Sequence, residues 1–185
     1  MVTTVKPKLT LENFLQQPET KPASEFIDGK ITQKPMPQGQ HSRIQYKLCA
    51  VINNIAETEK IACAFPELRC NFESKSIVPD VVVLEWDKIP LTDTGKIANR
   101  INTYPDWCIE ILSPEQSLTQ VLDKLLLCSQ FGTQLGWLIN PEEEAIFALL
   151  PEQKLRLFKN NDPLPVLEKV NLKLTVNEIF NWLKF

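Results

Sequence analysis

Hydrophobic residues recur at helical spacing in four stretches of the chain, and each stretch predicts an amphipathic helix. The clearest covers residues 41–55, and its apolar face is expected to lie on a sheet. A second covers residues 117–129 and begins with a serine, a residue type that caps helices. Two shorter helices are expected after Thr10 and near Thr175, which are also capping residues.

Short apolar runs between these stretches predict the strands of a sheet. We expect strands at residues 63–72, 78–84, 107–112, 135–140, 145–150 and 154–158. Residues 25–32 predict a hairpin, because Asp28-Gly29 between two β-prone runs favours a tight turn. Residues 86–105 are polar and irregular, and we expect this long loop to be mobile without nucleic acid.

The 185 residues suffice for a sizeable core, and 43% hydrophobic with 23% charged residues is ordinary for a globular protein. Helix and strand patterns alternate without a repeat, so we expect one α/β domain over residues 1–185, with residues 1–8 as a flexible tail.

A formal charge of −3 argues against a strongly basic nucleic-acid-binding surface but leaves room for a local patch. No stretch approaches about 20 apolar residues or resembles a signal peptide, so we expect no membrane partner and a cytoplasmic location.

The five cysteines show no paired spacing and mostly have apolar neighbours. We interpret them as small core residues of a reducing compartment, with a disulfide or zinc site as the alternative. His41 is the single histidine, which excludes histidine-rich zinc sites. A Ser-His-Asp mechanism would pair it with Ser113, but a serine followed by proline lacks the sharp turn that such nucleophiles use.

Two of the apolar runs each contain one carboxylate, Asp80 in the first and Glu110 in the second. A buried carboxylate costs several kcal/mol, roughly, unless a charge, a hydrogen bond or a metal compensates it. Neighbouring strands lie about 4.8 Å apart, so two such side chains at matching heights can hold one divalent cation. The pattern therefore predicts metal-assisted hydrolysis by two carboxylates that converge on one solvent-reachable pocket.

Each carboxylate has an alternative interpretation. Asp80 could be a strand-start residue whose charge is satisfied by backbone amides, whereas a mid-strand glutamate such as Glu110 has few harmless places to point. Asp106 also follows a proline, but it would lie about 13 Å from Glu110 along the same strand, too far to share an ion. We therefore select Asp80 as the partner of Glu110.

Five short motifs follow one another along the chain. They are Glu25-Phe26-Ile27-Asp28-Gly29, His41, Pro79-Asp80, Glu110-Ile111-Leu112-Ser113-Pro114 and Asp123-Lys124. In this order they resemble the Uma family of the PD-(D/E)xK restriction-endonuclease-like superfamily, and the resemblance runs from about Leu9 to the C-terminus. It implies an α/β fold with a restriction-endonuclease-like mixed central sheet flanked by helices. It also implies a metal-dependent endonuclease that acts on DNA.

The resemblance implies that Asp80, Glu110 and the backbone carbonyl of Ile111 hold Mg²⁺ or Mn²⁺. These hard cations prefer oxygen ligands to the available cysteines. Nothing in the residues themselves excludes RNA as the substrate.

The chain departs from the superfamily pattern at the lysine that usually stands two residues after the glutamate, because that position is Leu112. In the Uma family the lysine lies on the following helix, which makes Lys124 the candidate. A tyrosine is common four residues later in the family, where this chain has Cys128. The fold prediction does not depend on either position.

Two further residues keep two interpretations each. Glu25 is either a charge at the rim of the hairpin or the N-terminal acidic residue that approaches the metal site in many of these nucleases. His41 is either a capping or structural residue or a catalytic one. A rival to the enzyme is a catalytically silent nuclease-like module for binding or assembly, in the form of a homodimer, since phosphate contacts normally require several cations.

Overall fold

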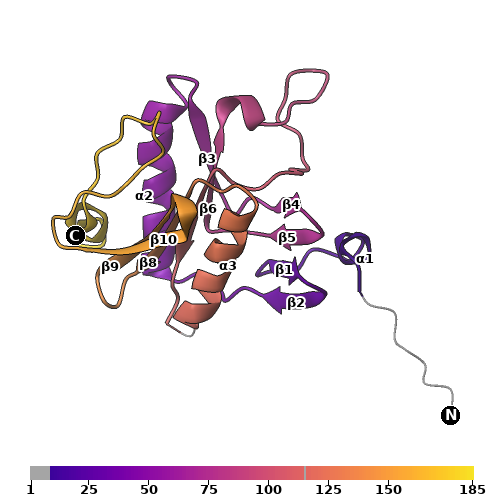
Figure 1. Ribbon diagram of the computed structural model, residues 1–185, viewed down its shortest axis with the longest axis horizontal. Coiled ribbons are helices and arrows are strands. Elements are labelled where there is room, and N and C mark those ends of the chain that lie inside the picture. The colour runs from indigo at the N-terminus through magenta and orange to yellow at the C-terminus, as the bar shows by residue number, and fades with distance from the viewer. Residues whose placement is uncertain (1–8, 115) are drawn as a thin grey trace, which may run out of the picture.

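The computed structural model describes residues 9–114 and 116–185, and within them two β-sheets pack with four α-helices (Figure 1). The helices are α1 (Leu11–Leu15), α2 (Gly39–Ala56), α3 (Leu118–Gln130) and α4 (Val176–Asn181). Thr10 and Thr175 cap α1 and α4 as expected, and Thr175 forms a capping box with Glu178. The flexible tail expected at residues 1–8 lies outside the described residues.

The larger sheet has six strands in the order β10-β9-β8-β7-β6-β3. Their bounds are β3 (Ala62–Pro66), β6 (Val81–Glu85), β7 (Trp107–Ile111), β8 (Leu135–Asn140), β9 (Ala145–Leu150) and β10 (Lys154–Lys159). Strands β7 and β8 are parallel, and the other neighbouring pairs are antiparallel. The expected mixed central sheet of an α/β protein is confirmed.

The smaller sheet has four antiparallel strands in the order β2-β1-β5-β4. Their bounds are β1 (Ser24–Ile27), β2 (Lys30–Gln33), β4 (Cys70–Phe72) and β5 (Lys75–Ile77). The predicted hairpin joins β1 to β2, and both turn residues are left-handed, Asp28 at φ 51° and Gly29 at φ 86°. Figure 1 shows this sheet beside the larger one, with α1 beyond it.

Helices α2 and α3 cover opposite faces of the larger sheet. The α2 residues Ile44 and Leu48 share one buried cluster with Ile109, whereas Leu125 of α3 shares the other cluster with Cys108. Successive side chains of β7 therefore point to different layers. Glu110, two residues after Cys108, belongs to the α3 side, where the smaller sheet also packs.

Two sequence predictions need correction, and one strand was missed. Residues 63–72 form two strands in different sheets, because the chain turns after β3 with Glu67 at φ 47°. The strand expected at residues 78–84 begins only at Val81, so Asp80 precedes β6 by one residue. Strand β5 was not predicted, since its three residues carry no apolar pattern.

The loop after β6 opens with a 3₁₀ turn, Trp86–Lys88, and has isolated bridges between Leu91 and Ile97 and between Ile101 and Cys70. Its mobility stays a prediction.

All five cysteines are free, so the disulfide alternative is wrong. Over residues 9–114 and 116–185, no helix combines the length and the apolar character needed to cross a bilayer.

Candidate active site

Asp80 and Glu110 stand opposite each other on neighbouring segments. Val81 of β6 pairs with Ile109 of β7 in an antiparallel register, which places the residue before Val81 opposite the residue after Ile109. Both carboxylates are buried, at 2% and 1% exposure. The backbone pairing thus brings the two acidic side chains to matching heights, as the sequence predicts.

One ammonium joins the two carboxylates. Lys34 Nζ lies 2.5 Å from Asp80 Oδ1 and 4.0 Å from Glu110 Oε2. Because both distances start at the same nitrogen, the separation of the two oxygens cannot exceed their sum. That sum is below the limit of about 8 Å for a shared ion. Convergence is confirmed, but neither carboxylate is itself open to solvent, so the expected direct opening into a pocket is wrong for this state.

Asp80 has partners on both oxygens. Oδ2 accepts a hydrogen bond from the backbone N–H of Ile111 at 2.7 Å and lies 3.1 Å from His41 Nε2. Burial alone would raise the pKa of Asp80, but Lys34 and His41 together hold that pKa below its ordinary value. The alternative of a carboxylate satisfied only by backbone amides is wrong, because one amide and two side chains share it.

Glu110 is less well satisfied than Asp80. Its Oε1 lies 2.8 Å from Lys124 Nζ as an ion pair, but within the described part of the chain this buried oxygen accepts no well-directed hydrogen bond. Burial raises the pKa of Glu110 to about 7, although Lys124 and Lys34 oppose that shift. Glu110 thus accepts a proton more readily than Asp80 does.

Lys124 reaches the cluster from α3. Its ammonium donates to both oxygens of Glu25, at 2.9 and 3.1 Å, and Glu25 Oε1 also accepts the N–H of Val78 at 2.8 Å. Burial would lower the pKa of Lys124, but Glu110 and Glu25 raise it well above its ordinary value. Glu25 is 8% exposed, so its interpretation as a rim charge is wrong.

His41 lies in the first turn of α2 and is buried. The residue at the N-cap position is Gln38, so the capping interpretation of His41 is wrong. Its Nε2 faces Asp80, whereas its Nδ1 has no hydrogen-bond partner among residues 9–114 and 116–185. Ser113 Oγ also has none among these residues, so His41 and Ser113 are not hydrogen-bonded to each other as a Ser-His-Asp mechanism requires.

Lys34 is the member of the cluster that sequence reasoning missed. It follows the solvent-exposed strand β2 and precedes a proline, a context typical of a surface lysine. Its partner Asp80 is 46 positions away, beyond the reach of any local pattern. The one available signal was charge balance, because Asp80, Glu110 and Glu25 together require more than one buried cation.

Five charged side chains form one alternating chain through the protein. In order of contact they are Asp80, Lys34, Glu110, Lys124 and Glu25, and His41 contacts Asp80 at the start of the chain. These side chains come from both sheets, from α2 and α3 and from the segments that follow β2 and precede β6. The cluster therefore forms only when all the layers of the fold are assembled.

The donor set suits a hard divalent cation. Two carboxylates from adjacent segments face one position, and the positively charged ammonium of Lys34 occupies it. An extended residue points its N–H and C=O to the same side, so the carbonyl of Ile111 faces the side on which its N–H meets Asp80. Within the described ranges no three Asp, Glu, His or Cys side chains are grouped to hold a metal, so an ion would rely on backbone and water oxygens beside the two carboxylates.

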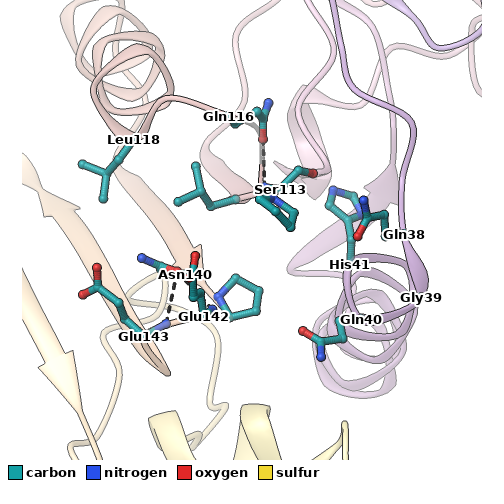
Figure 2. Close-up of a pocket in the computed structure, with 13 residues that line it drawn as sticks. Gln38, Gly39, Gln40, His41, Ser113, Gln116, Leu118, Asn140, Glu142 and Glu143 are labelled. Atoms are coloured by element: carbon teal, nitrogen blue, oxygen red, sulfur yellow. Dashed lines mark hydrogen bonds between the residues drawn. The ribbon is translucent and has the colours of Figure 1, made fainter.

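Two cavities flank this cluster. One of about 770 Å³ lies beside His41 and Ser113 and is bounded across from them by Asn140, Glu142 and Glu143 (Figure 2). The other, of about 450 Å³, is lined by Glu25 and Lys124 among others. Asp80 and Glu110 line neither cavity, whereas their partners His41 and Lys124 do.

Comparison with known proteins places the chain in a family. Residues 11–177 match the model of the Uma2 family, described as "Putative restriction endonuclease". The chain belongs to this family. A solved structure described as a putative nuclease from Anabaena variabilis ATCC 29413 is 48% identical, with a TM-score of 0.92 over 95% of this chain and 99% of that one. Among curated proteins, no sequence matches.

Proposed function

We propose that this Uma2 family member is a metal-dependent endonuclease that hydrolyses phosphodiester bonds in DNA. The observation that carries the proposal is the pair of buried carboxylates, Asp80 and Glu110, that face one cation position from neighbouring segments. The family description and the nuclease description of the 48% identical protein support the same reaction class. DNA as the substrate rests on the family description alone.

In this proposal Asp80, Glu110 and the carbonyl of Ile111 would hold Mg²⁺ or Mn²⁺. Bound there, the ion supplies Lewis acidity, which makes a water more acidic and neutralises charge on the scissile phosphate. His41 fixes the orientation of Asp80 through the contact at Oδ2. The backbone N–H of Ile111 holds the same oxygen from the other strand.

Lys124 supplies the cation that Leu112 does not provide. Its ammonium lies 2.8 Å from Glu110 and is held in place by Glu25. From that position it can orient a water molecule or stabilise negative charge that develops on the phosphate. Glu25 therefore acts as the positioning residue of Lys124.

A second candidate function is a catalytically silent nuclease-like module that binds or assembles, as a homodimer. One observation favours it: Lys34 already fills the position between the two carboxylates. A lysine that never leaves this position would neutralise the pair permanently, and the charge cluster would then serve the fold alone.

The test is incubation of supercoiled plasmid with the purified protein and Mg²⁺ or Mn²⁺, beside a chelator control. Glu110→Gln removes the charge that the proposal needs, and Asp106→Asn is the matched control, since Asp106 is a buried carboxylate just before the same strand. We expect cleavage by the wild type and by Asp106→Asn, and none by Glu110→Gln. Equal cleavage by Glu110→Gln would remove the proposal, and no cleavage by any protein, with no Mn²⁺ binding, would favour the silent module.

A further inference from the structure

The surroundings of Lys34 Nζ consist of oxygen atoms. Besides Asp80 Oδ1 at 2.5 Å and Glu110 Oε2 at 4.0 Å, the ammonium donates to the backbone carbonyl of Val78 at 2.7 Å. Two carboxylates and a carbonyl are the ligand types that bind hard divalent cations. We call this point between Asp80 and Glu110 the bridging position.

The two buried lysines of the cluster differ in what they contact. Lys34 touches both carboxylates of the proposed metal pair, whereas Lys124 touches Glu110 and Glu25 but not Asp80. An ion shared by Asp80 and Glu110 must therefore take the place of the Lys34 ammonium, while Lys124 can stay where it is. Two cations at the bridging position would repel each other strongly at such short range.

The attachment of Lys34 allows its ammonium to leave. Its backbone is fixed by a hydrogen bond from its N–H to the carbonyl of Ala23 at 2.9 Å, but the preceding strand β2 is exposed along its whole length. The side chain is a flexible four-carbon stem, and a rotation about it moves the charge without unfolding the sheet. Lys124, in contrast, sits in the interior of the thirteen-residue helix α3.

We propose that Lys34 is a built-in counter-cation of the active site, which holds the two carboxylates together without metal and is displaced when a divalent cation binds. The inference rests on the proposed metal-dependent function. It gives Lys34 two effects of opposite sign: it stabilises the metal-free fold, and it weakens metal binding by competition. A purely structural lysine would have only the first effect.

The experiment is calorimetric titration of the protein with Mn²⁺, together with thermal unfolding without metal. Lys34→Met removes the charge, Lys34→Arg keeps it, and Lys75→Met is the matched control. The side chain of Lys75 is 11% exposed, against 8% for Lys34, and it is also ion-paired, with Asp28 at 3.3 Å, but it lies on β5 and contacts neither Asp80 nor Glu110. We expect Lys34→Met to bind Mn²⁺ about tenfold more tightly or better than the wild type, and to unfold at a lower temperature without metal.

Lys34→Arg and Lys75→Met are expected to bind Mn²⁺ like the wild type. Equal or weaker binding by Lys34→Met, with the wild type still binding Mn²⁺ through Asp80, would overturn the role of Lys34 and leave the proposed function standing. Absence of Mn²⁺ binding from both the wild type and Lys34→Met would overturn the metal site itself, and the role of Lys34 with it.

A second measurement uses the wild type and does not depend on whether Lys34→Met folds. Amine acetylation followed by mass spectrometry reports how accessible each lysine is, and Lys34 is shielded at 8% side-chain exposure. We expect labelling of Lys34 to rise several-fold when Mn²⁺ saturates the protein, while labelling of Lys75 stays constant. Unchanged labelling of Lys34 in the Mn²⁺-saturated protein would show that the ammonium is not displaced.

Discussion

A buried carboxylate lies near each end of β7, and the surroundings of the two differ. Asp106, just before the strand, is fully buried, and its Oδ2 accepts the N–H of Glu85 at 2.8 Å. Its Oδ1 pairs with Lys88 and accepts from Gln134. Glu110, near the other end of the strand, has an oxygen without a directed hydrogen bond.

The balance of charge separates these two regions. Asp106 is a single carboxylate with one lysine of its own, so its charge is neutralised where it stands. Around Glu110, three carboxylates share two ammonium groups, which leaves a surplus of negative charge in a buried place. A divalent cation can neutralise the excess negative charge of several buried carboxylates, whereas a balanced ion pair has only a structural role.

The largest effect is expected from Lys124→Ala. Removal of this ammonium should lower the rate of DNA cleavage by about 10²–10³-fold, the loss typical of a removed electrostatic stabiliser. Circular dichroism should show that the fold is retained, and Mn²⁺ binding should persist or tighten because a competing positive charge is gone. Unchanged cleavage would show that Lys124 is not the missing lysine of the superfamily pattern.

Asp106→Asn tests the other side of the comparison. The change weakens the acceptor for Glu85 and removes the partner of Lys88, so we expect a loss of about 1–3 kcal/mol in the free energy of unfolding. Chemical denaturation measures this loss. Mn²⁺ affinity should stay within about twofold of the wild type, since Asp106 takes no part in the cluster. A large fall in metal affinity would contradict the division into two independent regions.

The burial of Glu110 also predicts how stability depends on pH without metal. The folded pKa of Glu110 is about 7 against an ordinary value of 4.5, so the folded state binds its proton more tightly than the unfolded state does. Between those two values stability should therefore fall as pH rises, by an amount of the order of 3 kcal/mol, and then level off above about pH 7. The measurement is the free energy of unfolding in urea at several pH values, for the wild type minus that for Glu110→Gln. A difference in unfolding free energy that does not change with pH would contradict the raised pKa of the buried Glu110.

The smallest effect is expected from Lys88→Ala. Lys88 has 37% side-chain exposure, and the pairs of such surface lysines contribute about 0–1 kcal/mol. After this change Asp106 still accepts the hydrogen bond from the N–H of Glu85. The free energy of unfolding should therefore fall by less than it does in Asp106→Asn. If Lys88→Ala lowers the free energy of unfolding by more than Asp106→Asn does in the same denaturation experiment, the stability of the Asp106 region depends mainly on Lys88.

The sequence pattern predicted much of this fold and only part of the site. Strands β8 and β9 match the expected ranges 135–140 and 145–150, because regular apolar patterns encode buried strands locally. The pairing of Asp80 with Glu110 followed from two unusual polar positions in apolar runs. The contact of Lys34 did not, since a flexible lysine after an exposed strand carries no local sign of its distant partner.

The most direct test of the central claim is the anomalous scattering of crystals soaked with Mn²⁺. We expect one anomalous peak between Asp80 and Glu110, within about 2.0–2.6 Å of an oxygen of each, with the Lys34 ammonium moved away. The carbonyl of Ile111 should complete the protein ligands. No peak at this position at saturating Mn²⁺, with Lys34 still between the two carboxylates, would contradict the claim that this pair is a metal site.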